Sequence, residues 1–379
     1  MIITETTLII CTLVVLFATL TPLLNPFFRR IDFNKSKDLT AELPPVAIII
    51  TVHDNTADLS KHLPLFLNQD YPALFQVIIV TEKNDSTTEN ILKQYSHDKH
   101  LYVTFIPESS RYMSRKKLAI TLGVKASKCE WNILTEASCK PQSNKWLESM
   151  AQNFTQAYNL VIGYSNYLPN NNTYERFEHL RTFYYLIQRA QKQIAYRTNG
   201  TNLAFKKSDF ISGDGFRGNL HTTRGEYDFL VNKYAEKNRT AVELRPQAWI
   251  KEDYPTKQIW QSRYLFYLNS RKFLKRSPSF RALFNTDMVA MFANYLLILV
   301  ATAYAVSQHN YILLVVAVLS MLITLILRIY IARKALLKFN EQIPSLKIIL
   351  FECQIIFSNL SYFLKYKKAD KNEFTTHKL

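Results

Sequence analysis

Cysteine is scarce in this chain. Its 379 residues include four, Cys11, Cys129, Cys139 and Cys353, and no two of them stand close together in the sequence. A structural zinc site or a disulfide framework needs cysteines at short, repeated spacings. The spacing therefore argues against both, and we expect the four side chains to be packing residues.

Glycine is scarce as well, with seven residues, and three of them fall within Ser212–Gly218. Glycine allows positive φ angles and a close approach of the backbone to a ligand. This segment is therefore either a mobile loop at an active site or an ordinary surface turn.

Acidic residues are few relative to basic ones, 30 against 47, which gives a formal net charge of +17. Such an excess occurs in proteins that bind nucleic acid and in proteins that lie on membranes. Here many basic residues stand beside long apolar segments, and no basic stripe with interleaved aromatics stands elsewhere, so we expect no nucleic-acid partner. A hydrophobic content of 48% with 13% aromatics excludes a disordered chain.

The first long apolar stretch is Thr6–Phe28, which is uncharged and is followed by Arg29 and Arg30. It is long enough to cross a hydrocarbon layer of about 30 Å. Met1–Thr7 lacks Lys and Arg, whereas a cleaved signal peptide has a basic start and a shorter apolar core. We expect a retained transmembrane anchor.

Met288–Val306 and Tyr311–Ile331 are two further apolar runs, separated by Ser307–Asn310. They predict a transmembrane hairpin. The spans carry almost no charge apart from Arg328, which argues against a transporter, because transport pathways are lined by polar or ionisable groups.

A fourth run, Ile343–Leu364, contains Lys347 and Glu352. These charges favour an interfacial helix in contact with membrane lipids. Basic residues flank the sides of the spans that face the middle of the chain; they are Arg29, Arg30, Lys35, those of Arg271–Arg281, Arg328, Arg333, Lys334 and Lys338. By the positive-inside rule the central segment is cytoplasmic, in a protein of the inner or plasma membrane.

The sequence thus predicts four parts. They are a transmembrane anchor at 1–29, a cytoplasmic domain at 30–255, an interfacial basic segment at 256–285, and the hairpin, interfacial helix and basic tail at 286–379.

The cytoplasmic domain begins with Val46–Val52, a continuous apolar run of the kind that forms a strand buried on both faces of a parallel sheet. Similar runs follow, with helical segments between them. The predicted strands are 46–52, 77–80, 102–105 and 131–134, and the predicted helices are 59–68, 87–95 and 116–127. This alternation predicts a doubly wound α/β domain, which binds ligands at the carboxyl ends of its strands.

The fourth predicted strand ends in Glu136-Ala137-Ser138. A divalent cation that grips a diphosphate needs hard oxygen ligands held close together, and an acid-any-acid triplet after a buried strand supplies them. Here Ser138 replaces the second acid and is a poorer ligand. Glu136 and Ser138 are the candidate metal residues for Mg²⁺ or Mn²⁺, with phosphate oxygens completing the coordination.

Several segments, in this order, resemble the membrane-bound members of glycosyltransferase family 2, which have the nucleotide-binding fold called GT-A. The resemblance covers most of residues 45–273. It is carried by the first strand with His53-Asp54-Asn55, Asn68–Pro72, Thr81-Glu82, Ser114–Ala119, Thr135–Pro141 with Trp146, and Gly200–Phe205.

The resemblance implies roles for individual residues. Thr51, His53 and Asp54 would cradle the base and ribose of a nucleotide sugar, and Glu82 would accept a hydrogen bond from it. Glu136 would contact either the metal or the ribose. Asp54 and Glu82 are equally placed to cap the following helices. Lys117 would offset the charge of the diphosphate at a helix start, or it belongs to a solvated basic turn.

Arg224–Asp228 resembles the acidic patch that holds the catalytic base in inverting members of the family. Glu226 is the first candidate and Asp228 the second, although both also suit the start of a helix. The Gln-x-x-Arg-Trp signature of processive members is not reproduced at Arg263–Tyr267. This argues against a processive polymer synthase. Arg263 is either a contact to phosphate or a surface arginine near an interfacial helix.

The sequence therefore predicts a non-processive or divergent member of the family that acts as a hexosyltransferase. It would move a sugar from a nucleoside diphosphate donor, which we expect to be UDP-linked, to a lipid-linked or cell-envelope glycan acceptor. The transfer would proceed with inversion. The alternative is a catalytically inactive relative that binds a nucleotide or glycan and serves as a membrane scaffold for other envelope-biosynthesis proteins. Ser138, Tyr227 and the missing signature favour this alternative.

Overall fold

The computed structural model describes residues 5–33, 42–52, 56–107, 114–169 and 173–375. The chain forms two compact units. The helical unit comprises residues 1–30, 173–185 and 276–360, and the sheet unit comprises 31–172, 186–275 and 361–379. The four-part division predicted from the sequence remains a prediction, since these units group 173–185 with the terminal helices and 361–379 with the sheet.

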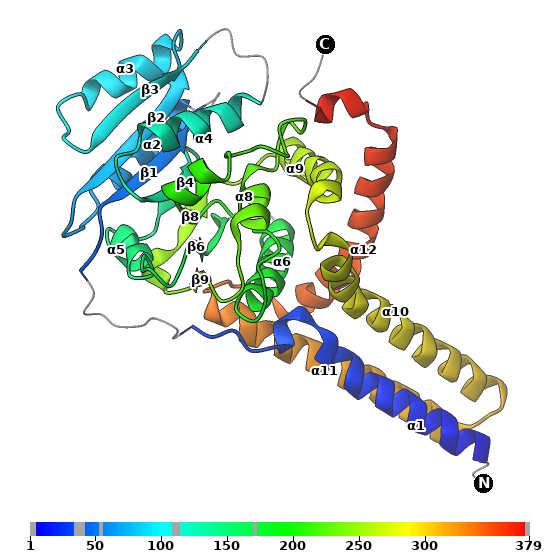
Figure 1. The fold of residues 1–379 in the computed structure, drawn as a ribbon. Helices are drawn as coiled ribbons and strands as arrows, with labels where there is room; N and C mark the ends of the chain where they lie inside the picture. The colour runs from blue at the N-terminus through cyan, green and yellow to red at the C-terminus, as the bar shows by residue number, and fades with distance from the viewer. Residues whose placement is uncertain (1–4, 34–41, 53–55, 108–113, 170–172, 376–379) are drawn as a thin grey trace. The chain divides into compact units, whose positions relative to one another are not determined.

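The sheet unit is built on a seven-stranded sheet in the order β3-β2-β1-β4-β8-β6-β9 (Figure 1). Its first four members are parallel and contain the four predicted strands; they are β1 (Val46–Thr51), β2 (Phe75–Glu82), β3 (Leu101–Ile106) and β4 (Trp131–Glu136). The sheet continues through β8 (Leu203–Lys206), which is antiparallel to β4, and then β6 (Leu160–Gly163) and β9 (Thr240–Glu243). The predicted α/β class with a parallel-rich central sheet is confirmed.

A second, three-stranded sheet in the order β5-β10-β7 carries part of the candidate site. Its strands are β5 (Cys139–Pro141), β10 (Ile250–Glu252) and β7 (Ser165–Tyr167). Because β5 follows β4 after two residues, this small sheet continues from the carboxyl end of a central strand.

Helices follow the strands as the sequence predicts. The helices up to the fourth strand are α2 (Thr56–Leu67), α3 (Ser86–Gln94) and α4 (Arg115–Ala126). Ser114 caps α4 by accepting a hydrogen bond from the Lys117 amide at 3.2 Å. Gly123 lets α4 pack closely on β1, because a Cβ at this position would lie 2.6 Å from Ile49 Cγ2. This packing fixes α4 against the sheet.

The remaining helices of the chain's middle are α5 (Trp146–Ala151), α6 (Tyr174–Ala190), α7 (Lys207–Ser212), α8 (Glu226–Tyr234) and α9 (Lys257–Ser270). Residues 213–218 follow α7 as a series of turns, in which Asp214, Gly215 and Gly218 have positive φ angles.

Among the described residues, four helices are long and apolar enough to cross a membrane by length and composition. They are α1 (Glu5–Leu20, extended by a 3₁₀ turn to Leu24), α10 (Ser277–Ser307), α11 (Tyr311–Lys338) and α12 (Ser345–Lys368). Helices α1, α10 and α11 pack together (Figure 1) around Val14, Ile298 and Leu313. The predicted hairpin is present as two helices, and the interfacial position of α12 remains a prediction.

The helical unit also contains a buried ionic network that the hydropathy pattern did not predict. Arg328 donates to Glu352 at 2.6 Å and to Asp287 at 3.0 and 3.2 Å. Arg181 donates to Asp287 at 2.7 Å. Arg328, the charge noted within the predicted hairpin, thus has two acidic partners. Helix α10 begins at Ser277, earlier than its apolar run, and so brings Asp287 into the bundle.

Candidate functional site

The carboxyl ends of three neighbouring strands place predicted site residues at one edge of the central sheet. Thr51 at the end of β1 is the register partner of Glu136 at the end of β4, and Glu82 ends β2 on the other side of β1. This is the edge at which open α/β sheets bind ligands. His53 and Asp54 lie outside the described residues, so their predicted contacts stay predictions.

The turn at Glu136–Ser138 is held from two sides. His62 Nδ1 lies 2.9 Å from the Ala137 carbonyl oxygen, and the Asp253 amide donates to the Ser138 carbonyl at 2.9 Å. These bonds connect the turn to α2 and to the segment after β10. The position of Glu136 is therefore set by backbone contacts on either side of it.

Glu136 forms an ion pair with Lys116, whose Nζ lies 2.6 Å from Oε1. The Glu136 side chain is 15% exposed and the Lys116 side chain 33%. Burial acts to raise the pKa of Glu136, but the charges of Lys116, Arg263 and Arg224 outweigh burial and lower it. Burial likewise opposes the charge on Lys116, while Glu136 and Glu226 raise its pKa. Both partners are therefore charged at neutral pH.

The residues predicted to hold a divalent cation do not fit one. Ser138 Oγ is buried and has no hydrogen-bond partner among the described residues. Glu136 Oε1 already accepts from an ammonium group. Within the part of the chain that the structure describes, no three His, Cys, Asp or Glu side chains are grouped so as to hold a metal. One neutralised carboxylate and one hydroxyl are fewer ligands than Mg²⁺ or Mn²⁺ prefers.

The three basic residues at the start of α4 have different partners. Arg115 Nε donates to Glu82 at 2.6 Å, and Lys116 pairs with Glu136. Lys117 is fully buried, and its Nζ donates to the carbonyl oxygens of Asn219 (2.5 Å) and Thr222 and to Thr222 Oγ1 (2.8 Å).

An ammonium group has three donors, so Lys117 is saturated by protein oxygens. Burial lowers its pKa to about 8. The structure thus corrects the assignment of the diphosphate contact to Lys117. Lys117 holds the segment at Asn219–Thr222, and its neighbour Lys116 is the accessible cation.

The two candidate bases stand in the first turn of α8, after Gly225. This glycine has φ +101°, and a Cβ here would also lie 3.0 Å from Ser270 Cβ, so the tight entry to α8 requires glycine. Glu226 is buried; Oε2 accepts from the Gly225 amide at 3.2 Å, and Oε1 has no partner among the described residues.

Asp228 is paired, in contrast to Glu226. Its Oδ2 accepts from Arg197 at 3.3 Å, and burial raises its pKa to about 6 despite that partner. A base must present a lone pair to the substrate, so this geometry favours Glu226 over Asp228.

Three further residues belong to the site, and of these Glu252 was not identified from the sequence. Glu252 at the end of β10 forms an ion pair with Arg263, which also donates to the Tyr167 hydroxyl at 3.3 Å. Arg263 is therefore a site residue and not simply a surface arginine. Tyr227 has a buried hydroxyl without a hydrogen-bond partner in the described chain. Burial raises its pKa well above the ordinary value, and Glu136, Glu226 and Glu252 add to that effect.

The unpartnered atoms indicate that a ligand belongs here. A buried polar atom without a partner costs about 1–3 kcal/mol, and Glu226 Oε1, Tyr227 Oη and Ser138 Oγ are three such atoms. A polar ligand with several hydroxyl or phosphate oxygens would satisfy them. The cluster formed by Lys116, Glu136, Glu226, Tyr227, Glu252 and Arg263 is hereafter called the site cluster.

No protein-family model matches the chain, and no curated protein matches it. Among solved structures, the chain is similar to the mannosyltransferase PcManGT from Pyrobaculum calidifontis in complex with GDP-Man and Mn²⁺, with 13% identity over 85% of this chain and 98% of that chain and a TM-score of 0.49. It is also similar to residues 1–349 of S. aureus TarS in complex with UDP-GlcNAc, with 11% identity over 66% of this chain and 73% of that chain and a TM-score of 0.43. At these identities and scores the likeness does not establish a shared function.

Proposed function

We propose that this chain is a membrane-anchored glycosyltransferase of the GT-A type, which moves a sugar from a nucleoside diphosphate donor, UDP-linked, to a lipid-linked or cell-envelope glycan acceptor. The observation that carries the proposal is the site cluster at the carboxyl edge of the sheet. It combines cations suited to a diphosphate with Glu226, whose Oε1 is buried and unpartnered. The motif order that resembles family 2 supports the same assignment.

The proposed reaction is a direct displacement. Glu226 takes the proton of the acceptor hydroxyl, the acceptor oxygen bonds to the anomeric carbon, and the bond from that carbon to the diphosphate oxygen breaks with inversion. Thr51 and Glu82 are assigned to the nucleoside. Arg115 bonded to Glu82 at 2.6 Å would keep that carboxylate oriented. The divalent cation expected from the sequence has no step in this mechanism, because the residues present do not fit it.

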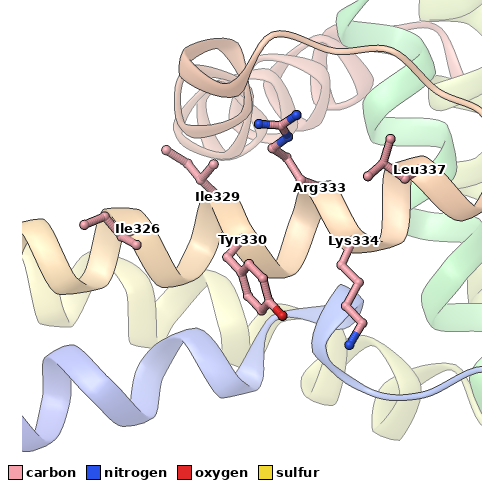
Figure 2. A pocket seen from close by; sticks show the side chains of 6 residues that line it. All are labelled: Ile326, Ile329, Tyr330, Arg333, Lys334 and Leu337. Atoms are coloured by element: carbon pink, nitrogen blue, oxygen red, sulfur yellow. The ribbon is translucent and has the colours of Figure 1, made fainter.

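Membrane lipids are the second proposed partner. A groove of about 540 Å³ runs along α11 and is lined by Ile326, Ile329, Tyr330, Arg333, Lys334 and Leu337. These positions follow one face of the helix at spacings of three and four residues. Figure 2 shows the six side chains along α11, with Arg333 and Lys334 toward its carboxyl end. Exposed cations beside apolar side chains suit an anionic headgroup with its acyl chain and support a cytoplasmic location for this end.

The alternative is a catalytically inactive relative that binds a nucleotide or glycan as a membrane scaffold, with other envelope-biosynthesis proteins as partners. Two observations favour it. Ser138 provides a neutral hydroxyl at the degenerate triplet, and Tyr227, a poor acid and base at neutral pH, stands between the two carboxylates of α8.

Nucleotide binding and turnover separate the two functions. We would titrate the detergent-solubilised protein with UDP, GDP, ADP and CDP by calorimetry and then follow release of the nucleoside diphosphate from the matching sugar donor in the presence of membrane lipid extract. We expect Glu226→Gln to bind the nucleotide like wild type and to lower turnover about a hundredfold or more. Glu236→Gln, an exposed acid just beyond α8, is the matched control.

Either of two results would count against the transferase. If the protein binds a nucleotide but shows no turnover that the Glu226→Gln substitution lowers, the scaffold is favoured. If it binds none of the four nucleotides, a donor site is rejected altogether.

A further inference from the structure

The site cluster contains a cation at the place where the sequence predicts a metal. Lys116 Nζ lies 2.6 Å from Glu136 Oε1, on the acid that begins the degenerate triplet. The same ammonium group lies 5.6 Å from the centre of the Tyr227 ring, a distance at which the ring face attracts a cation. Lys116 is therefore held between an acid and an aromatic ring within the candidate site.

Lys116 is also the lysine at the start of α4 that has donors to spare. Lys117 is saturated by three protein oxygens. Arg263 is bound to Glu252 and to Tyr167. Lys116 has three donors, of which Glu136 takes one, and its side chain is one-third exposed. A phosphate oxygen that enters the site can therefore bond to Lys116 without displacing Arg263 or Lys117.

The charge balance leads to the same conclusion. Glu136, Glu226 and Glu252 supply three negative charges to the site, while Lys116, Lys117, Arg224 and Arg263 supply four positive ones, as the mutual effects of these groups show. A further divalent cation is not needed to prevent repulsion between the acids. A diphosphate is the ligand that an excess of fixed cations accommodates.

We propose that Lys116, supported by Arg263, neutralises the donor diphosphate in place of a divalent cation, so that nucleotide binding and sugar transfer by this chain are independent of metal. The inference rests on the proposed function. When the donor binds, Lys116 donates to a phosphate oxygen with its free N–H groups. Glu136 keeps the ammonium group in position and so acts as the fixed counter-ion of a lysine and not as a metal ligand.

The test compares Lys116→Gln and Lys116→Arg with a control, Lys125→Gln. Lys125 is an exposed lysine near the other end of the same helix. Each variant is titrated by calorimetry with UDP and with uridine, once in EDTA and once in Mn²⁺. Uridine lacks the diphosphate, so its affinity reports whether the nucleoside part of the site is intact. Thermal unfolding of each variant checks that it is folded.

We expect EDTA to leave the affinity of wild type for UDP within about twofold. Lys116→Gln should weaken UDP binding about tenfold or more, because a charge-assisted hydrogen bond is lost, with uridine binding unchanged. Lys116→Arg should restore most of the affinity, and Lys125→Gln should resemble wild type.

A site that uses a metal gives the opposite pattern. UDP binding is then lost in EDTA and regained in Mn²⁺, and Lys116→Gln binds UDP in Mn²⁺ as well as wild type or better, because Glu136 has been released for the ion. That result would overturn the inference and leave the proposed transferase in place. If wild type binds no nucleoside diphosphate in either condition, the proposed function fails and the inference fails with it.

Discussion

The chain contains two ionic clusters of similar composition that differ in how completely their groups are paired. In the helical unit, Arg181, Arg328, Asp287 and Glu352 are at most 1% exposed, and two cations balance two acids. Both oxygens of Asp287 accept from arginine, and the Glu352 oxygens accept from Arg328 and from Asn25, the latter at 2.6 Å. Every carboxylate oxygen in this closed cluster has a donor.

The site cluster of the sheet unit is open by comparison. Lys116 and Arg263 are each about one-third exposed on their side chains, and Glu226 Oε1 and Tyr227 Oη lack partners among the described residues. The carboxylates of the closed cluster leave no acceptor for a ligand, although Arg181 Nε has no hydrogen-bond partner among the described residues. The closed cluster fixes α10, α11 and α12 to one another and to Arg181 of α6. Unused acceptors beside exposed cations indicate binding. The difference between the clusters therefore lies in their unused acceptors and in the exposure of their cations.

Removal of one acid from the closed cluster should have the largest effect. Asp287→Ala leaves Arg181 and Arg328 buried without a shared acceptor, and we expect it to destabilise the protein by about 3–5 kcal/mol. The measurement is thermal unfolding of the detergent-solubilised protein together with its elution on size exclusion. Glu5→Ala removes an exposed acid of the same unit and should behave like wild type. An Asp287→Ala protein as stable as wild type would show that the closed cluster does not hold the helices together.

The sequence was sufficient for the long elements of the fold. Strands β1 and β2 are continuous runs of buried apolar residues, and the spans are long apolar helices, so composition and length identify them. It was insufficient for β5, β7 and β10 and also for β6, β8 and β9, because strands of three or four residues show too little periodicity. Hydropathy also did not reveal the closed cluster. It shows that Glu352 is charged, but it does not show which residue pairs with Glu352 in the tertiary structure.

The candidate site was predicted in part, for a comparable reason. Glu136 and Glu226 follow sequence signals, the end of a buried strand and an acidic helix start. Among the basic residues at the start of α4, the diphosphate contact was assigned to Lys117, one residue after Lys116. Successive residues on a helix point about 100° apart, so Lys117 turns into the core while Lys116 faces Glu136. Glu252 reaches the turn after β4 only when β10 pairs with β5, where it is the register partner of Cys139, and no local pattern indicates this pairing.

Asp228 of the sheet unit can be compared with Asp287 of the closed cluster through the pH dependence of stability. Burial raises its folded pKa to about 6, above the value of about 3.9 in an unfolded chain. The folded state therefore binds the proton more tightly, so stability falls as the pH rises through this window and the loss is complete above about pH 6. We expect Asp228→Asn to be more stable than wild type at pH 8 by about 1–3 kcal/mol.

The same variant should lose that advantage near pH 4, and unfolding temperatures measured from pH 4 to pH 8 give the comparison directly. An Asp228→Asn protein less stable than wild type at pH 8 would mean that the Arg197 pair outweighs burial. Asp228 would then belong to a closed arrangement like that of Asp287.

The smallest effect is expected at residues 373–375, which contact the segment that leads into Glu226 of the site cluster. Phe374 is buried against Leu268 and Tyr366, and its carbonyl oxygen accepts from the Thr223 amide at 3.1 Å. Lys117 holds the adjacent Thr222 from the other side. The segment that leads into Glu226 is thus fixed between α4 and residues 373–375. Phe374→Ala should release one side of it by local fraying and not by global unfolding.

We therefore expect Phe374→Ala to lower kcat about threefold to tenfold while the affinity for UDP stays that of wild type, because Lys116 and Glu136 are carried by α4 and β4 and pair with each other. Phe374→Leu, which keeps an apolar side chain, should recover most of the rate. A loss of UDP affinity equal to the loss of kcat would contradict this division, since it would mean that the segment supports the whole site. Equal kcat in Phe374→Ala and wild type would show that Lys117 alone is enough to position Glu226.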